Sequence, residues 1–526
     1  MCSRAIWEQS LGFLSWTTEQ FLSNQERSLK QQLKLLAASP LGQQMLGQVP
    51  IETIGELRER MPLTDYDAYA GTLGERQDEV LPATPSSWLR TSGRSDGSPK
   101  WVPLSRAARD QLAWTTLGLL IAARAREQGD VRLDREISIL NLTAPPPYFS
   151  GTAVAAFADL RPWPARLYPP SDARLEALTV EERMAIAFSG AGRAGVDFAL
   201  SYSSVLAGVG GTFTGRHPPY TPSADLRSRA RLTRARLAAM ICRRSLLPRD
   251  VWSPKAIIAG GMDAALFRRQ IIEQWGCDPL ELLGSTEGLF LGMQTWERTT
   301  TTLIPHFNFF EFIPEAELTE EGQQSTHVPA TLLLDELRLG EVYELVITNL
   351  LGGALLRYRT GELLRLTGLS NQDSVIQLPQ FRYHGQRSDL IEVGGFARIS
   401  EQILVRAMNA AGIEPAEWTA RKEIEASMPI VCIRVELAHG SVAEDRALGA
   451  RLNATLRELD PDWRDMEDIA DIHPLRLQRL PTGTFDQLAA SGVLGTGRCA
   501  RMNASDTVIN MLDVLARDAA ARASPQ

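Results

Sequence analysis

The sequence predicts an α/β protein: a large N-terminal domain with mixed or parallel sheets flanked by helices, plus a small α+β C-terminal cap domain. The chain has 526 residues, and a single hydrophobic core stops growing beyond about 250–300 residues. Strand-like and helical patterns alternate through the first 388 residues, and the pattern then changes to short helices and strands. We therefore expect one domain at residues 1–388 and a second at residues 389–526.

The elements of the N-terminal domain follow from apolar spacing and turn residues. Residues 6–46 show helical spacing, and residues 105–129 predict a long helix with Ser105 as its N-cap. Three further segments predict, in order, a strand entering a proline-rich loop, an arginine-rich helix, and a strand, glycine turn and helix: 135–151, 224–247 and 254–276.

Shorter apolar runs predict the remaining strands. In the N-terminal domain these runs are 280–288, 307–315, 342–350 and 363–369. In the C-terminal domain we expect helices at 399–412 and 443–459, strands at 429–438 and 475–480, and a final turn and helix at 483–492.

Composition excludes several classes of protein. Hydrophobic residues make up 44% and charged residues 22%, as in ordinary folded domains. The net charge of −8 argues against binding to nucleic acid or an anionic membrane surface. No apolar run approaches the roughly 20 residues of a membrane span, and no signal peptide is evident. Five scattered cysteines without metal spacing indicate a cytoplasmic protein without a structural metal.

The segment TSGRSDGSPK, residues 91–100, has the composition of a phosphate-binding loop. Its glycines let the backbone approach a ligand, its hydroxyl groups donate hydrogen bonds, and Lys100 supplies a positive charge. The same composition also occurs in ordinary surface loops. Lysine is rare in this chain, because the others are only Lys30, Lys34, Lys255 and Lys422. Lys100 is therefore one of very few lysines in this chain that could bind a phosphate.

Three more segments end a strand-like run with a polar turn. They begin at Ala259, Leu283 and Leu356, and a fifth segment, at His384, lies where the composition changes. In open α/β sheets such turns gather at the carboxyl ends of strands and form the ligand crevice. We expect these segments to converge.

In their order along the chain, these five segments resemble the adenylate-forming superfamily of acyl-activating enzymes. The likeness is strongest to the acyl-acid amido synthetases that conjugate auxin and to phenylacetate-CoA-ligase-like enzymes. It extends from about Leu63 to Cys499 and includes residues 304–315, 343–368 and 481–492. The resemblance implies formation of an acyl adenylate from a carboxylic acid and ATP with Mg²⁺, followed by transfer to a thiol or an amine.

The resemblance also implies roles for individual residues. Five residues of the first loop would hold the phosphates of ATP: Thr91, Ser92, Gly93, Ser95 and Lys100. Gly260 and Gly261 would expose backbone to the acyl group and adenine. Ser285 and Thr286 would contact the nucleotide, and Glu287 would hold Mg²⁺. The alternative for Glu287 is a carboxylate that complements a helix dipole.

Further positions match the nucleotide site and the hinge of that superfamily. Tyr358 would pack near the nucleotide, and Glu362 would bind the ribose in place of a shorter aspartate. Arg387 would also contact the ribose, although a solvated linker arginine is the alternative. Asp389 matches the hinge about which the C-terminal domain would move.

The sequence departs from the superfamily at the lysine of the C-terminal domain that assists adenylation. Gly495 occupies that position, no lysine follows Lys422, and Arg498 or Arg501 would have to replace it. The loop also carries Arg94 and Asp96, and an acid is unfavourable beside phosphate.

Three functions remain open. The first is an ATP-dependent acyl-activating enzyme that transfers the acyl group to CoA, a carrier-protein phosphopantetheine or an amine. The second is an ATP-independent acyltransferase that moves an acyl group from acyl-CoA to a carrier protein or amine. The third is a binding protein without catalysis.

An aryl acid is the expected substrate. The acyl pocket is expected in residues 197–213, with Phe198, Tyr202 and Phe213 suited to a flat ring. An ordinary buried helix is the alternative for this segment.

Overall fold

The computed structural model describes residues 3–47, 51–91, 100–170, 172–213, 226–261, 264–318, 328–387, 390–394, 397–425, 428–438, 445–470, 473–491, 493–494 and 499–523. They fall into two compact units, of which the first ends at Gly385 and the second begins at Gln386. The sequence places the domain boundary after residue 388, three residues beyond this division.

An 11-stranded sheet forms the centre of the first unit, in the order β10-β11-β12-β13-β9-β8-β7-β6-β5-β3-β4. Neighbouring strands from β4 to β7 run parallel, whereas β7 with β8 and β10 with β11 are antiparallel. The sheet is mixed, as the predicted fold class requires. Its strands are β3 (Ile137–Asn141), β4 (Ala165–Tyr168), β5 (Phe198–Tyr202), β6 (Ala256–Gly260), β7 (Leu280–Ser285), β8 (Leu289–Gln294), β9 (Thr301–Leu303), β10 (Asn308–Pro314), β11 (Val342–Asn349), β12 (Tyr358–Gly368) and β13 (Gln380–Gln386).

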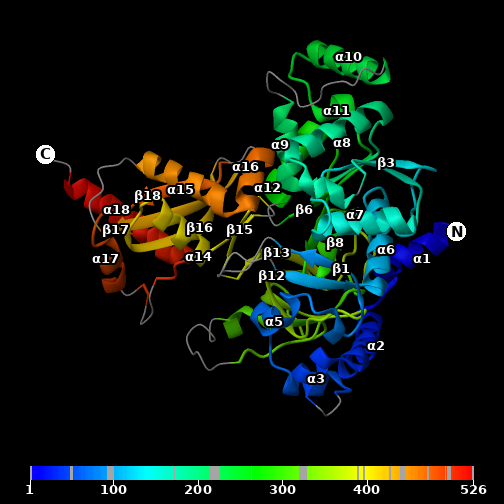
Figure 1. Cartoon of the computed structure of the whole chain (residues 1–526), viewed down its shortest axis with the longest axis horizontal. Coiled ribbons are helices and arrows are strands. Elements are labelled where there is room, and N and C mark those ends of the chain that lie inside the picture. The colour runs from blue at the N-terminus through cyan, green and yellow to red at the C-terminus, as the bar shows by residue number, and fades with distance from the viewer. Residues whose placement is uncertain are drawn as a thin grey trace. The chain divides into compact units, whose positions relative to one another are not determined.

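Helices flank the parallel half of this sheet. Figure 1 shows α6 and α7 on one side of these strands and α8 and α9 on the other. The helices of the first unit are α1 (Ser3–Leu11), α2 (Thr18–Ala37), α3 (Pro40–Leu46), α4 (Ile54–Arg60), α5 (Ala70–Leu73), α6 (Arg106–Ala122), α7 (Phe149–Leu160), α8 (Val180–Ala194), α9 (Ser203–Thr212), α10 (Leu226–Ile241), α11 (Pro248–Val251) and α12 (Ala264–Trp275).

Local sequence explains where these elements begin and which of them are central. The Ser105 side chain accepts a hydrogen bond from the Ala108 amide and caps α6, as the sequence predicts. The predicted helix at 105–129 ends earlier, at Ala122. Every residue of β11 is buried, and its one charged side chain, Glu344, pairs with Arg359 on β12 at 2.6 Å.

A hairpin carries the ends of the predicted phosphate loop. Strands β1 (Pro85–Arg90) and β2 (Trp101–Ser105) pair antiparallel. The Thr91 amide donates to the Lys100 carbonyl at 3.0 Å, which continues the ladder by one step. Lys100 is therefore held at the end of a paired strand.

The second unit has its own core and sheets, in agreement with the predicted α+β domain. Strands β14 (Leu390–Val393) and β15 (Ala397–Ser400) form a hairpin, and β16 (Pro415–Glu425), β17 (Met428–Leu437) and β18 (Leu475–Arg479) form a three-stranded sheet. Its helices are α14 (Glu401–Ala410), α15 (Asp445–Leu459), α16 (Pro461–Ala470), α17 (Thr484–Ala490) and α18 (Asp506–Ala523). The sequence analysis did not anticipate β16, α16 or α18.

Candidate active site

Three side chains from distant segments meet at the carboxyl edge of the parallel strands. Lys100 Nζ lies 3.3 Å from Glu287 Oε1 and 3.4 Å from the Tyr358 hydroxyl. The Tyr358 hydroxyl lies 3.4 Å from the same carboxylate oxygen. Glu287 is 5% exposed and Tyr358 4% exposed. The structure thus brings together three residues that sequence reasoning assigned to one site.

Two buried amides fix the turn that carries Glu287. Ser285 ends β7, and its Oγ accepts a hydrogen bond from the Gly288 amide at 3.0 Å. Asn349 Nδ2 donates to the Glu287 carbonyl at 3.0 Å, and Asn308 Nδ2 donates to the Gly288 carbonyl at 2.6 Å. These hydrogen bonds restrict the backbone conformation of the turn, and they therefore fix the point from which the Glu287 side chain extends.

Asn308 and Asn349 were missed by sequence reasoning. They bond to each other at 2.9 Å, from Asn349 Nδ2 to Asn308 Oδ1. Both lie in buried strands, where asparagine is depleted because its amide needs a hydrogen-bonding partner. An asparagine within an otherwise apolar strand pattern was the available signal.

A second buried network holds Tyr358 at the start of β12. Arg357 has a left-handed backbone, with φ 44, and its guanidinium contacts both carboxylate oxygens of Glu311, at 3.0 and 3.1 Å. The Tyr69 hydroxyl accepts a hydrogen bond from the Leu356 amide at 2.9 Å. Burial raises the pKa of Tyr69 to about 12, so this phenol stays protonated. Together these contacts fix the position of Tyr358.

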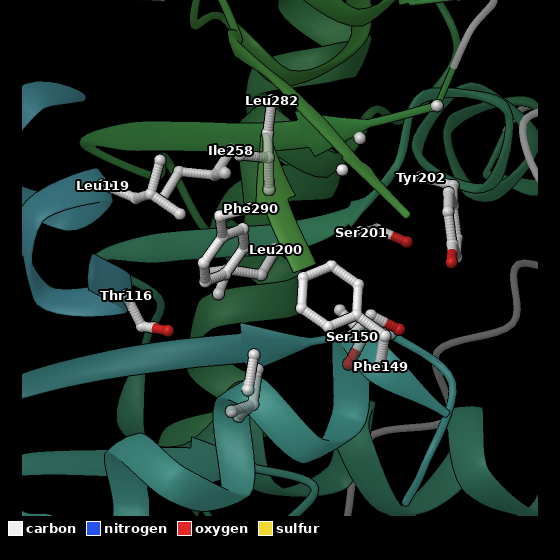
Figure 2. A pocket seen from close by; sticks show the side chains of 16 residues that line it. Thr116, Leu119, Phe149, Ser150, Leu200, Ser201, Tyr202, Ile258, Leu282 and Phe290 are labelled. Atoms are coloured by element: carbon white, nitrogen blue, oxygen red, sulfur yellow. The ribbon is translucent and has the colours of Figure 1, made fainter. Parts of the chain in front are cut away.

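A cavity of about 90 Å³ lies beside this cluster, between the parallel strands and helices α6 and α7. Figure 2 shows the rings of Phe149 and Phe290 near its centre. The lining contains no charged side chain: Thr116, Leu119, Thr143, Phe149, Ser150, Ala153, Val154, Leu200, Ser201, Tyr202, Ile258, Gly260, Gly261, Leu282, Gly284 and Phe290. Such a site accommodates an uncharged, largely apolar group.

The predicted acyl-pocket residues lie in different places. Tyr202 lines the cavity at the last position of β5. Phe198 belongs to the same strand but is fully buried in the main core, and it does not line the cavity. Phe213 packs edge-on against Trp252, with ring centroids 5.4 Å apart, and is also absent from the lining. The segment 197–213 therefore contributes to the cavity through the last three residues of β5, Leu200 to Tyr202, and not through Phe198 or Phe213.

The remaining predicted residues lie in the cavity lining, in the turn after β7, within β12, in the second unit or outside the described residues. Gly260 and Gly261 line the cavity, and Gly261 has φ 104, which favours glycine. Thr286 is partly exposed in the turn after β7, and Glu362 is buried within β12. Arg387 is partly exposed at the start of the second unit. Positions outside the described residues are Ser92, Gly93, Arg94, Ser95, Asp96, Asp389, Gly495 and Arg498.

The side chains present fit a nucleotide and a magnesium ion. Lys100 offers a positive charge, Ser285 and Thr286 offer hydroxyl groups, and Glu287 offers a carboxylate. Mg²⁺ is commonly held by one or two carboxylates together with substrate phosphates. Within the described ranges, no group of three or more His, Cys, Asp or Glu side chains could hold a metal by itself. Glu287 would therefore share the ion with phosphate oxygens.

Residues 10–152 match the sequence model of the GH3 family N-terminal domain, and residues 301–386 match that of the GH3 family central domain. These parts of the chain are similar to two domains of the GH3 family. The resemblance to acyl-acid amido synthetases that the sequence predicts is confirmed. Lys100 lies within the first domain and Tyr358 within the second.

Curated relatives match through part of their length. A jasmonoyl–L-amino acid synthetase of Oryza sativa subsp. japonica is 28% identical over 205 residues, which are 36% of this chain and 34% of that protein. An indole-3-acetic acid-amido synthetase of Oryza sativa subsp. indica is 30% identical over 200 residues, 36% of this chain and 31% of that protein. The match thus spans about a third of the length of these relatives.

Solved structures extend the likeness over the whole fold. The acyl acid amido synthetase AtGH3.15, in complex with 2,4-DB, has a TM-score of 0.54 at 18% identity and covers 98% of this chain and 96% of its own. A 2-hydroxyisobutyryl-CoA ligase in complex with 2-HIB-AMP and CoA has a TM-score of 0.54 at 13% identity, with 91% and 94% covered. These likenesses confirm the predicted fold class. No helix in the described ranges has the length and apolarity needed to cross a membrane.

Proposed function

We propose that this chain is an enzyme that uses ATP to convert a small carboxylic acid into an acyl adenylate and then transfers the acyl group to an amine. The observation that carries this proposal is the meeting of Lys100, Glu287 and Tyr358 beside an uncharged cavity. Gly284 lines the cavity, and Glu287 follows three residues later. An acid bound in the cavity would thus place its carboxylate close to a nucleotide at this turn.

The chemistry requires charge compensation at phosphate. A carboxylate oxygen of the substrate attacks the α-phosphorus of ATP, the bond to pyrophosphate breaks, and the acid gains AMP as a leaving group. Lys100 would neutralise the phosphate charge that develops, and Tyr358 would support the same group through its hydroxyl. Mg²⁺ held at Glu287 would supply further electrostatic stabilisation. Exclusion of water by the apolar lining would protect the activated acid.

An amino acid is the favoured acceptor because one plant relative is named a jasmonoyl–L-amino acid synthetase and the other an amido synthetase. Attack of the amine on the acyl carbon forms the amide and releases AMP. CoA and a carrier-protein phosphopantetheine remain further possible acceptors from the sequence analysis, and the 2-hydroxyisobutyryl-CoA ligase structure holds CoA. A cytoplasmic location likewise stays a prediction.

One observation favours a second candidate, an acyltransferase that starts from acyl-CoA without ATP. No lysine follows Lys422, and Gly495 stands where the superfamily has its C-terminal lysine. Arg501, one candidate replacement, pairs with Glu401 at 2.9 Å and lies over the Trp418 ring. Arg498, the other candidate, stays a prediction. A preformed thioester would make adenylation unnecessary.

ATP–pyrophosphate exchange with a panel of small acids tests the proposal. We expect exchange with at least one acid, and Lys100→Met should reduce it by about 100-fold or more, as for loss of a transition-state charge contact. Because Lys100 also neutralises buried Glu287, Lys100→Arg is included to keep a charge there. Lys30→Met is the matched control, because Lys30 is half exposed and pairs with Glu26 on its own helix.

Two results would contradict adenylation. One is the absence of exchange with every acid in the wild-type protein. The other is full exchange in Lys100→Met with unchanged thermal stability. Acyl transfer from acyl-CoA to an amine without ATP, with no exchange, would establish the second candidate instead.

A further inference from the structure

Two buried hydroxyl oxygens line the cavity without a hydrogen-bonding partner in the described part of the chain, Ser150 Oγ and Thr116 Oγ1, and of these two residues Thr116 is the one buried as a whole. Thr116 lies on α6 and is 3% exposed, and its Oγ1 atom has no partner. The neighbouring Thr115 differs, because its Oγ1 accepts from Gln111 Nε2 at 3.3 Å. A buried polar atom without a partner costs free energy, so its retention indicates that something else satisfies it.

The direction of this hydroxyl points to a bound group. Figure 2 shows the Thr116 oxygen directed toward the interior of the cavity, at the opposite end from Tyr202. The surrounding walls at the Thr116 end are apolar, with Leu119, Ile258 and Phe290 among the lining residues. Nothing in these walls competes for the hydroxyl.

The direction of the strands distinguishes the two ends of the cavity. Leu200 and Ile258 line it two residues before Tyr202 and Gly260, which end their strands. Two residues of a strand correspond to about 7 Å. The strand ends face the turn that carries Glu287, so the substrate carboxylate belongs at that end. Thr116 therefore faces the part of the acyl group that lies farthest from the carboxylate.

The lining also restricts the charge and size of that remote part. All sixteen lining residues are uncharged, and a buried charge requires a partner. The cavity has a volume of about 90 Å³ and is partly open, so a compact group can occupy it without being wholly enclosed. A compact acyl group of at most one ring suits it.

We propose that this cavity selects small acids that carry an uncharged hydroxyl or carbonyl group at the end remote from the carboxylate, and that Thr116 binds this group. A threonine hydroxyl both donates and accepts hydrogen bonds, so either group would satisfy it. This inference rests on the proposed function and specifies its substrate class. It makes Thr116 a specificity-determining residue.

Matched pairs of acids test the inference. The pairs are 4-hydroxybenzoate with 4-methylbenzoate and 4-oxopentanoate with 4-methylpentanoate, and kcat/KM is measured from ATP-dependent pyrophosphate release. The wild-type protein should prefer the polar member of a pair by 10-fold or more. Thr116→Val should abolish this preference by lowering kcat/KM for the polar acid 10–100-fold while leaving that for the apolar acid equal or higher.

Two control variants separate this role from general packing. Thr116→Ser keeps the hydroxyl and should keep the preference. Thr115→Val removes the adjacent buried hydroxyl, which does not line the cavity, and should leave the ratio unchanged.

Equal kcat/KM within both pairs, or an equal loss for both members in Thr116→Val, would overturn the inference and leave the proposed function standing. If no acid releases pyrophosphate, the proposed function fails, and calorimetric binding of the same pairs then decides the role of Thr116. In that case equal binding of both members would overturn it.

Discussion

At the scale of single residues, buried ion pairing organises the candidate site. Glu287 is almost fully buried, and an ionised carboxylate in that environment needs a nearby positive charge. Lys100 provides it at 3.3 Å while its own side chain remains 18% exposed. The lysine is thus accessible to a ligand and already fixed in position. Because Lys100 is already ordered by this ion pair, binding of a phosphate here would cost less side-chain conformational entropy.

The buried ring of His306 should make the stability of the protein depend on pH. His306 lies edge-on to Phe13 and Trp16, and burial lowers its pKa from 6.5 to about 4. Between these values the unfolded chain binds more protons than the folded one, so stability falls as the pH drops from about 6.5 toward 4. At pH 5 the His306 ring should lower the free energy of unfolding by about 2 kcal/mol relative to its value at pH 7.5.

Replacement of the ring tests this effect. His306→Phe keeps an aromatic ring against Phe13 and Trp16 but removes the titrating group. Urea unfolding of both proteins at pH 5 and pH 7.5 should show a smaller pH difference in the variant. The same pH difference in both proteins would assign the effect to other groups.

At the scale of elements, sequence patterns predict helices and strands better than the side chains that support the site. The Ser105 cap and the turn after β7 follow from local residues, whereas the strand predicted at 363–369 begins earlier, at Tyr358. Arg357 and Asn349 do not, because their roles depend on Glu311 and on the Glu287 carbonyl, which lie far away in sequence. Phe198 was assigned to the pocket because its segment combines small and aromatic residues, and this composition does not show which of them line a cavity.

Two glycines at strand ends should respond differently to the same substitution. A Cβ at Gly284 would lie 2.8 Å from the Leu289 carbonyl oxygen and 3.1 Å from Phe149, whereas one at Gly260 meets only Tyr202, at 3.9 Å. Gly284→Ala should therefore destabilise the protein by about 1–3 kcal/mol.

Gly260→Ala should leave the melting temperature unchanged but narrow the cavity and raise KM more for aryl acids than for short-chain acids. Thermal melts and acid-dependent kinetics check both variants. Equal melting temperatures for the two variants would contradict the packing argument.

At the scale of the whole molecule, each unit has a core of its own. The first is built around the large sheet, and a core cluster of the second joins α17 and α18 through Leu488, Ile509 and Leu512. The presence of two domains could be predicted from length and pattern. Helix α18 was missed, because the sequence analysis assigned no helix after residue 492. The match to relatives covers about a third of their length, and the two family domains match residues 10–152 and 301–386.

The separate cores predict that the second unit can be destabilised alone. Arg434 is 3% exposed and contacts Glu423 at 2.6 Å and both Asp513 oxygens at 2.9 and 3.0 Å. Arg434→Met would remove this cation from both carboxylates, and because Glu423 keeps Arg421 and Arg476 at 3.1 Å, the change should cost about 1–3 kcal/mol.

Calorimetry should therefore show one thermal transition shifted to lower temperature and the other unchanged. Acid binding at the cavity should be retained at temperatures below the shifted transition, because every lining residue belongs to the first unit. Arg464→Met is the control, because Arg464 is half exposed and pairs weakly with Asp465. A parallel shift of both transitions would mean that the two units unfold as a single cooperative structure, and the division at Gly385 would then have no thermodynamic meaning.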